Sequence, residues 1–500
     1  MRESALPMPA PRLRHFDRDT RRVRLLRAVP LLALTAATAA GCATNPVTGE
    51  TQLALISESQ EIQMGAEAAQ QVEQSIGLVD DASLQNYVQQ IGASLARDSE
   101  RPNLPWTFRV VDDPTPNAFA LPGGYIFITR GILGLMRSEA ELAGVIGHEI
   151  GHVTARHSVT MISRSQIAQL GLGLGSILVP EIARFGDLAS SGLSLLFLKY
   201  GRDAERQADE LGFRYALDDG YDVRDIPNVF AQLQRAGEAA GHSPLPSWLS
   251  SHPYPEERIA NIREMLAALP QSLDGTLRGV QTFMSQVDGL VYGENPRAGY
   301  FRDGLFLHPD LRFRVQFPQG WATQNLPRSV TAMSPDQDAM MQLSLAQGSE
   351  TQAANAFFGA QGLAARDVSR TSINGLPAVT GLFQAQTQSG VLTGIAAFIT
   401  LDNTTYQILA YGPAQAFPRY ERLLGSAIGS FARLTDPQAL NVQPNRIEVV
   451  ATPAAMTLAE FNRRYPSVIP IAELALINQL SGGDARIPAG TQLKRIVSRS

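Results

Sequence analysis

The sequence predicts an α+β chain of several domains, in which a mostly helical domain with a small sheet precedes an α+β domain and a short C-terminal unit. Three observations lead to this prediction. The chain has 500 residues, more than one hydrophobic core usually holds. The spacing of its apolar residues changes several times between helical and strand-like periods. Two turn-rich stretches, a connector at 271–299 and a linker at 436–446, separate segments of different character.

Residues 1–41 have the features of a secretory signal peptide. Eight Arg and three acidic residues make this segment basic, and its apolar run AVPLLALTAATAA has thirteen residues, too few to span a bilayer. The run leads into Ala-Ala-Gly-Cys42, which resembles a bacterial lipobox, although Leu is commoner than Ala at the first position. Cys42 is the only cysteine of the chain, so it has no intramolecular disulfide partner. We therefore expect cleavage and lipidation at Cys42, with a buried free thiol as the alternative.

Residues 42–56 are expected to form a lipidated tether. Residue 43, directly after Cys42, is Ala and not Asp. By analogy with bacterial lipoproteins, this predicts that the protein is located at the periplasmic face of the outer membrane of a Gram-negative bacterium. The chain after residue 41 carries 34 basic and 44 acidic side chains, a net charge of −10. This acidic balance argues against nucleic acid as a partner.

The mostly helical domain is predicted over 57–270. Apolar residues three and four apart predict helices up to about residue 100, and the runs WTFRVVDD and GYIFITRGIL then predict strands of a small sheet, separated by the turn-rich DPTPNAFALPGG. A further helix begins at Ser138, because Glu141 three residues later completes a capping-box pattern.

Two apolar, Gly-rich segments follow that helix, at 170–180 and 189–200. Neither reaches the roughly 20 residues of a membrane-spanning helix, so they are interpreted as buried or membrane-surface hairpin elements. Helical periodicity then resumes with RDAERQADELG and continues to about residue 269.

Residues 300–435 are predicted to form an α+β accessory domain. Five strand-like runs, among them GVLTGIAAFITLD and TTYQILAYG, precede a helix around PRYERLLGSAIGSFARL. No cluster of titratable residues marks a site in this domain, and a protein-binding or substrate-presenting role is the default hypothesis.

The last unit, 447–498, resembles a LysM module, a small βααβ unit. MTLAEFNRRY matches its first helix, AELALINQL with Asn478 its second, and IPAGTQLKRI with Gly490 its closing strand. The start PAAMTL departs from the usual Gly-Asp-Thr-Leu. The unit is therefore interpreted either as a peptidoglycan binder or as a packing module of similar fold.

The helix that begins at Ser138 carries the sequence GHEIGH. Successive helical residues rotate by about 100°, so His148 and His152 point the same way, one turn apart, and can bind one zinc ion. Glu149 lies beside them and can reach a metal-bound water without being a ligand. The helix is apolar enough to be buried, and a buried helix does not carry two imidazoles and a carboxylate without partners. His157 lies about half a turn round from His148 if the helix continues, so it is interpreted as a helix-end or packing residue.

A catalytic zinc takes three protein ligands and a water, so one ligand is missing. Glu205 and Asp209 in RDAERQADELG are four residues apart and share one helical face. Glu205 can be the third ligand, while Asp209 can hydrogen-bond a ligating histidine and fix its tautomer. The alternative is an exposed acidic stripe among Arg202 and Arg206.

GHEIGHVTARHS, followed about fifty residues later by ERQAD, resembles the zinc metallopeptidase family of the CAAX prenyl proteases, the HtpX-like membrane proteases and the periplasmic β-barrel assembly-enhancing proteases. NPVTGE after Cys42, NAFALPGGYIFITRGIL and SSHPYPEERIANI are similar to stretches that flank the catalytic core of this family. The resemblance covers about 45–270 and implies a zincin-type fold. It also implies one zinc ion per chain, held by His148, His152 and Glu205, with Glu149 as the base and Asp209 behind the ligands.

The function expected from these features is that of a zinc endopeptidase of the cell envelope that cleaves misfolded or mislocalised envelope proteins. Glu149 would deprotonate a zinc-bound water that attacks the peptide carbonyl. An edge strand over Asn117, Ala118 and Phe119 would pair with an extended, unfolded substrate. The alternative belongs to another class: an envelope chaperone or scaffold for outer-membrane protein assembly, with latent or minor proteolysis.

His252 lies in SSHPYPEER, where two prolines stiffen the chain. If this loop folds over the cleft, His252 is expected either to donate a hydrogen bond to the oxyanion or to occupy the open position of the zinc and keep the enzyme latent. Arg258 is a further oxyanion candidate.

Overall fold

The computed structural model describes residues 42–172, 198–239, 248–270, 272–326, 328–387 and 390–498. The expected signal peptide, 1–41, lies outside these ranges, as do most residues of the two apolar segments expected at 170–180 and 189–200. Within the described ranges, no helix is both long and apolar enough to cross a membrane.

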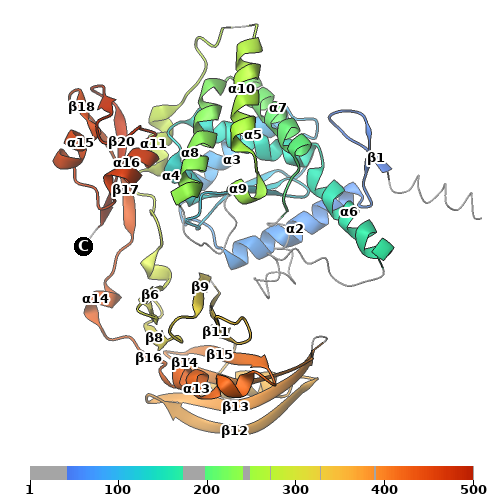
Figure 1. The fold of residues 1–500 in the computed structure, drawn as a ribbon, viewed down its shortest axis with the longest axis vertical. Coiled ribbons are helices and arrows are strands. Elements are labelled where there is room, and N and C mark those ends of the chain that lie inside the picture. Colours follow the sequence, from blue (N-terminus) through green and yellow to red (C-terminus); the bar gives the residue numbers. More distant parts are fainter. Residues whose placement is uncertain are drawn as a thin grey trace, which may run out of the picture.

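The first domain is built around helix α5 (Glu139–Thr154), every residue of which is buried. Ser138 caps its N-terminus, because its side chain accepts a hydrogen bond from the backbone N–H of Glu141. Figure 1 shows α5 at the centre of a layer of helices. These helices are α2 (Glu58–Ser75), α3 (Ala82–Arg97), α4 (Arg130–Leu135), α6 (His157–Leu172), α7 (Arg202–Asp218), α8 (Ile226–Ala239), α9 (Trp248–Ser251), α10 (Pro255–Ala268) and α11 (Val280–Val287).

Two glycines bring α5 and α7 unusually close together. A Cβ atom added at Gly212 of α7 would lie 2.5 Å from the backbone nitrogen of His148, and one added at Gly147 of α5 would lie 2.9 Å from the carbonyl oxygen of Gly212. Only residues without a side chain fit this crossing. The residues of α7 are thereby held against the histidine-bearing face of α5.

A three-stranded sheet packs beside α5, in the order β3-β5-β4. Its strands are β3 (Thr107–Val111), β4 (Ala118–Leu121) and β5 (Tyr125–Thr129). β3 and β5 are parallel, whereas β4 pairs with β5 in antiparallel fashion and forms one edge of the sheet. The segment expected as a tether also contains two short strands, β1 (Cys42–Thr44) and β2 (Thr51–Leu53), which pair because Asn45 closes the turn between them.

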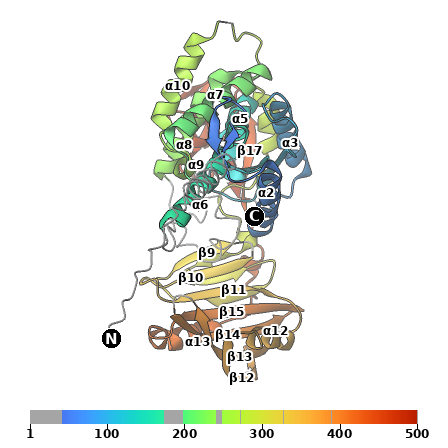
Figure 2. The same ribbon diagram turned by 90° about the vertical axis from the view of Figure 1, so that its right-hand side faces the viewer.

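The accessory domain contains a seven-stranded antiparallel sheet, and Figure 2 shows its strands in order from β9 at one edge to β12 at the other. Its order is β12 (Leu363–Ile373), β13 (Leu376–Thr387), β14 (Gly390–Leu401), β15 (Thr404–Pro413), β11 (Met340–Ala346), β10 (Ser329–Met333) and β9 (Ala322–Leu326). Successive residues of β14 pack on opposite faces of the sheet. Phe398 belongs to the core formed with α12 (Glu350–Phe358), and Ile399 belongs to the core formed with α13 (Glu421–Gly429). A second sheet comprises β16 (Ala432–Arg433), β8 (Phe313–Gln316), β7 (Leu305–His308) and β6 (Tyr300–Arg302). The chain is therefore α+β, as expected.

The C-terminal unit has six elements: β17 (Asn445–Ala451), β18 (Met456–Thr457), α15 (Leu458–Arg464), α16 (Ile471–Ile477), β19 (Arg486–Ile487) and β20 (Gln492–Ser498). β17 and β20 pair in antiparallel fashion. Although the sequence suggests a separate unit, its buried residues, such as Leu474 and Leu493, belong to the same hydrophobic cluster as Leu133 and Leu142 of the first domain. Figure 1 shows it beside α4, α8 and α11.

The segments that lead into and out of the accessory domain lie side by side. The backbone N–H of Tyr292 donates to the carbonyl of Asn445 at 2.8 Å, and Nη1 of Arg297 donates to the carbonyl of Leu440 at 2.7 Å. The accessory domain is thus inserted between two parts that share one core.

Candidate metal centre

Three residues expected as metal ligands come together where α5 crosses α7. Nε2 of His148 and Nε2 of His152 are 3.0 Å apart. Oε2 of Glu205 lies 3.6 Å from Nε2 of His148, and its Oε1 lies 3.5 Å from Nε2 of His152. Each of the three side chains is at most 1% exposed.

His252 joins this group from a distant part of the chain. Its Nδ1 lies 3.2 Å from Nε2 of His148 and 3.1 Å from Oε1 of Glu205. The ligand atoms of His148, His152, Glu205 and His252 all lie within 4.8 Å of one another. Ligands about 2.0–2.1 Å from a tetrahedral zinc are roughly 3.3 Å apart, close to the distances seen here, so these residues fit a zinc ion.

Asp209 holds His148 in the tautomer that zinc binding needs. Its Oδ1 lies 2.9 Å from Nδ1 of His148, so the Nδ1–H donates to this carboxylate and Nε2 keeps its lone pair. Burial raises the pKa of Asp209, but the Arg258 guanidinium outweighs burial and lowers it to about 2. The carboxylate is therefore available as an acceptor.

His157 orients the second histidine in the same way. Its Nδ1 is 2.9 Å from Nδ1 of His152, and its Nε2 is 3.0 Å from Oε1 of Gln207. An amide oxygen only accepts, so Nε2 of His157 carries the proton and its Nδ1 accepts from Nδ1–H of His152. The lone pair of His152 Nε2 then faces the cluster.

This contact depends on a break in the helix, whereas the sequence was interpreted as one continuous helix. α5 ends at Thr154, Arg156 has a φ of +58°, and α6 begins at His157. This break turns the imidazole of His157 back towards His152. His157 is a helix-end residue, as expected, and is not part of the ligand cluster. The half-turn offset from His148 that a continuous helix would give does not occur.

Glu149 has the surroundings of a general base. Its side chain is buried, and its Oε1 lies 3.4 Å from Nε2 of His252. Among the described residues, neither of its carboxylate oxygens has a hydrogen-bond partner. A buried carboxylate without such a partner is costly, and at an active site it is typical of a group that exchanges protons with a substrate or water.

Aromatic rings enclose the histidines. His252 stacks on Trp248, with ring centroids 4.9 Å apart, and His152 stacks on Tyr200 at 3.9 Å. Burial lowers the pKa of His252, but Glu205 and Glu149 outweigh burial and raise it above its usual value. Sequence reasoning missed Tyr200 and Trp248, because neither lies in a motif and both meet the site only through tertiary packing.

Arg258, expected as an oxyanion candidate, faces carboxylates. Its guanidinium lies between the rings of Phe230 and Trp248, 4.4 Å from each centroid. Nε and Nη2 donate to Asp209 at 2.8 and 2.5 Å, and Nη1 lies 3.1 Å from Oε2 of Glu205. Nη2 also lies 3.1 Å from Nδ1 of His148. This arrangement orients Asp209 and Glu205 and turns the guanidinium towards the metal ligands and their partner.

The expected edge strand lies next to the centre. Asn117 precedes β4, and Ala118 and Phe119 begin it; all three residues are buried. Pro116, just before them, accepts a hydrogen bond from the backbone N–H of Trp248 at 3.2 Å. The edge strand and the segment that carries His252 are therefore linked directly.

Residues 82–266 match the model of peptidase family M48. This part of the chain, which carries GHEIGH and ERQAD, is similar to that family. A putative β-barrel assembly-enhancing protease of Vibrio cholerae is 32% identical over 201 residues, 39% of this chain and 41% of the relative. The mitochondrial metalloendopeptidase OMA1 of Arabidopsis thaliana is 32% identical over 215 residues, 41% of this chain and 42% of that protein. The β-barrel assembly-enhancing protease of Escherichia coli is 28% identical over 229 residues, 44% and 46% of the two chains.

The matches span less than half the length of these relatives. They nevertheless confirm the family expected from GHEIGH and ERQAD. Zinc is the cofactor of this family, and the four clustered side chains of the M48 segment are suited to hold it.

Proposed function

We propose that this protein is a zinc-dependent endopeptidase of the bacterial cell envelope that acts on misfolded or mislocalised envelope proteins. The observation that carries the proposal is a buried carboxylate without a hydrogen-bond partner, Glu149, beside four clustered metal-ligating groups. The names of the bacterial relatives, β-barrel assembly-enhancing proteases, support an envelope location.

In this proposal His148, His152 and Glu205 hold the metal. Bound zinc supplies Lewis-acid activation of water and of the substrate carbonyl. Glu149 takes a proton from the attacking water and later returns it to the leaving amine. Asp209 and His157 keep the two imidazoles in their binding tautomers. β4 pairs through its backbone with an extended substrate, which suits unfolded segments of varied sequence.

The Glu149→Gln variant tests the proposal. It keeps the shape of the side chain but removes the base, so cleavage of an unfolded protein such as reduced casein should fall by about 10²–10⁴-fold. Zinc content, measured by elemental analysis, should stay at one ion per chain. Glu210→Gln, a change at an exposed glutamate of α7, is the matched control and should cleave normally. Purified wild type without zinc, or an active Glu149→Gln variant, would refute the proposal.

We further propose that the resting enzyme is latent, with His252 in the position that a water or substrate oxygen needs. The distances from its Nδ1 to His148 and Glu205, 3.2 and 3.1 Å, support this plug. The rival role of His252 is to donate to the oxyanion. In His252→Ala, a rise in proteolysis supports the plug, a fall supports the oxyanion role, and no change excludes both.

The closeness of His252 to His148 and Glu205 also favours the second candidate function, an envelope chaperone or scaffold with latent or minor proteolysis. Full complementation of a deletion strain by Glu149→Gln would favour the scaffold. Lost complementation by a variant that still binds zinc would favour the protease.

We propose that lipid at Cys42 anchors the protein to the outer membrane, facing the periplasm. The lipobox-like Ala-Ala-Gly-Cys42 after a basic and apolar leader supports this. Incorporation of labelled palmitate by wild type and by Cys42→Ser tests the anchor: equal labelling would exclude it.

We also propose that 447–498 serves as a packing module, with peptidoglycan binding as the alternative. Its shared core with the first domain supports packing. Co-sedimentation of the protein with purified peptidoglycan would contradict it.

A further inference from the structure

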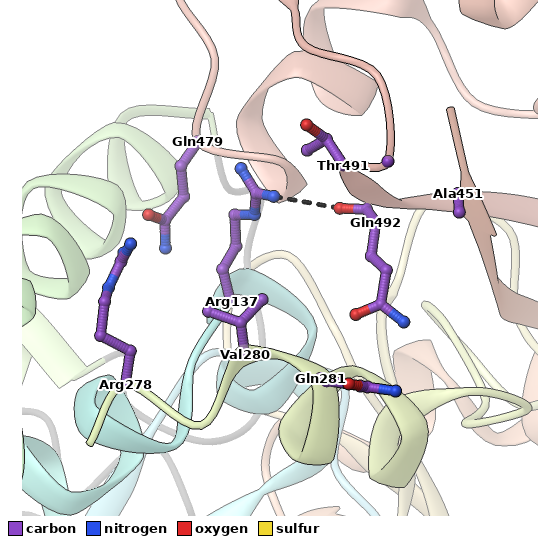
Figure 3. A pocket seen from close by; sticks show the side chains of 9 residues that line it. Arg137, Arg278, Val280, Gln281, Ala451, Gln479, Thr491 and Gln492 are labelled. Atoms are coloured by element: carbon purple, nitrogen blue, oxygen red, sulfur yellow. Dashed lines mark hydrogen bonds between the residues drawn. The ribbon is translucent and has the colours of Figure 1, made fainter. Parts of the chain in front are cut away.

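A cavity of about 580 Å³ lies between the first domain and the C-terminal unit (Figure 3). Arg137 and Arg278, from the first domain and its connector, line one side, and Gln479, Thr491 and Gln492 of the C-terminal unit line the other. This volume is typical of a small-molecule site. The cavity adjoins the N-terminal end of α5, whereas the metal ligands lie in the C-terminal half of that helix.

The arginine side of this cavity carries positive charge that is only partly balanced. Nη1 and Nη2 of Arg137 donate to the backbone carbonyls of Asn478 and Gln492, at 3.1 and 3.0 Å, and these acceptors are neutral. Its Nε is buried and has no hydrogen-bond partner among the described residues. Burial and the nearby Arg278 lower the pKa of Arg137, against the opposing effect of Glu141. A bound anion would relieve this unfavourable placement of charge.

Nearby acidic groups are already used. Glu141 accepts from the backbone N–H of Arg137 at 2.6 Å and from Nε2 of Gln479 at 2.8 and 2.9 Å. Asp225 accepts from Nε and Nη2 of Arg278, at 3.0 and 2.9 Å. Arg278 is nevertheless about half exposed, so its guanidinium can reach a second anion in the cavity.

The remaining lining offers amide and apolar groups. The side chains of Gln281 and Gln492 line the cavity, and each amide can donate and accept hydrogen bonds. Val280 and Ala451 add apolar surface to the lining. A peptide end has this combination of features: one carboxylate, adjacent amide groups and small apolar side chains. Inorganic phosphate offers only the charge.

We propose that this cavity binds the free C-terminal carboxylate of a short peptide. Arg278 meets the carboxylate, Arg137 adds positive charge beside it, and the amides of Gln281 and Gln492 pair with the last peptide groups. Peptide hydrolysis creates new ends of this kind, so the cavity can receive products of the metal centre; this role, unlike the binding itself, rests on the proposed function.

Calorimetric titration of the full chain tests the proposal. The probe is acetyl-trialanine with a free carboxylate, and its C-terminal amide is the matched control ligand. The Glu149→Gln background prevents cleavage, so binding is measured whether or not the protein is a peptidase. The carboxylate should bind at least tenfold more tightly than the amide, because charged hydrogen bonds to arginine are the stronger ones.

Two variants assign the binding to the cavity rather than to the metal centre. Arg278→Gln should weaken binding of the carboxylate about tenfold, whereas Arg263→Gln, at an exposed arginine of α10, should not. Gln281→Glu places like charge at an exposed lining position without disturbing packing, and should also weaken binding; Gln286→Glu on the same helix should not. Three results would each overturn the proposal. They are equal affinity for the carboxylate and the amide, unchanged binding in both cavity variants, and an affinity for inorganic phosphate equal to that for the carboxylate probe.

Discussion

His157 is the residue whose contribution is most sharply defined by its contacts. In His157→Phe a somewhat larger aromatic ring fills the site, and the acceptor for Nδ1–H of His152 is lost. Loss of such a partner typically costs 10–100-fold in metal affinity, and we expect a decrease of that size here. Competition with a fluorescent zinc chelator measures it. His308→Phe alters another histidine, in the accessory domain, and should leave the affinity unchanged. Equal zinc affinity of His157→Phe and wild type would exclude the orienting role.

Among single residues, the sequence predicts those whose positions follow from the local geometry of a helix. His148, Glu149 and His152 follow from helical spacing, and Glu205 and Asp209 from the same spacing on a second helix. The role of His157 could not be predicted, because it depends on the positive φ of Arg156, a residue type that rarely adopts it. Tyr200 and Trp248 reach the site only through packing between distant segments, which no local pattern encodes.

Strand β20 carries a buried lysine, Lys494, that packs near the start of helix α5. This lysine makes the free energy of unfolding depend on pH. Nζ of Lys494 donates to the carbonyls of Gly134 and Met136 at 2.5 and 2.7 Å. Burial, with a smaller effect of Arg137, lowers the pKa of Lys494 from 10.5 to about 7. A neutral amine still has two N–H groups for these two carbonyls.

The sign of the effect follows from proton binding. Between pH 7 and 10.5 the unfolded chain holds a proton on Lys494 that the folded protein lacks, so the free energy of unfolding rises with pH, by at most about 1.4 kcal/mol per unit. Denaturant unfolding at pH 7.5–9.5 should show this slope in wild type and a shallower one in Lys494→Met. Lys199→Met, at an exposed position, should match wild type. Parallel slopes in all three proteins would contradict the assignment.

At the level of elements, the sequence predicts most helices and strands but not how they dock. Ser138 caps α5 as predicted, but the capping box is not completed, because the Glu141 carboxylate accepts from the backbone N–H of Arg137. The alternation in β20 gives no sign that Lys494 is fully buried, since a lysine in a strand normally faces solvent. The close crossing of α5 and α7 also depends on which glycines meet, and here Gly147 and Gly212 do so across 65 residues of chain.

At the scale of the whole molecule, the order of domains in the sequence differs from their association in space. The accessory domain has its own cores, formed by its two sheets with α12 and α13. The C-terminal unit, which follows it in the chain, shares the core of the first domain. A unit with its own core can fold alone, whereas a unit that shares a core cannot be removed without exposing apolar surface.

This difference predicts opposite outcomes for two deletions. Residues 299–439 can be replaced by a short Gly/Ser linker, because Arg297 and Leu440 are in contact; the shortened protein should bind one zinc and unfold near the wild-type temperature. Truncation after residue 434 exposes the partners of side chains such as Leu474, Leu493 and Ile496, each worth about 1.5–3 kcal/mol when fully buried. The truncated protein should therefore unfold at a much lower temperature or fail to fold. Calorimetry and zinc analysis of both proteins distinguish the cases. A truncated protein as stable as wild type would mean that the C-terminal unit is an independent domain in solution, and its contacts with α4 and α5 would then add little to the stability of the metal centre.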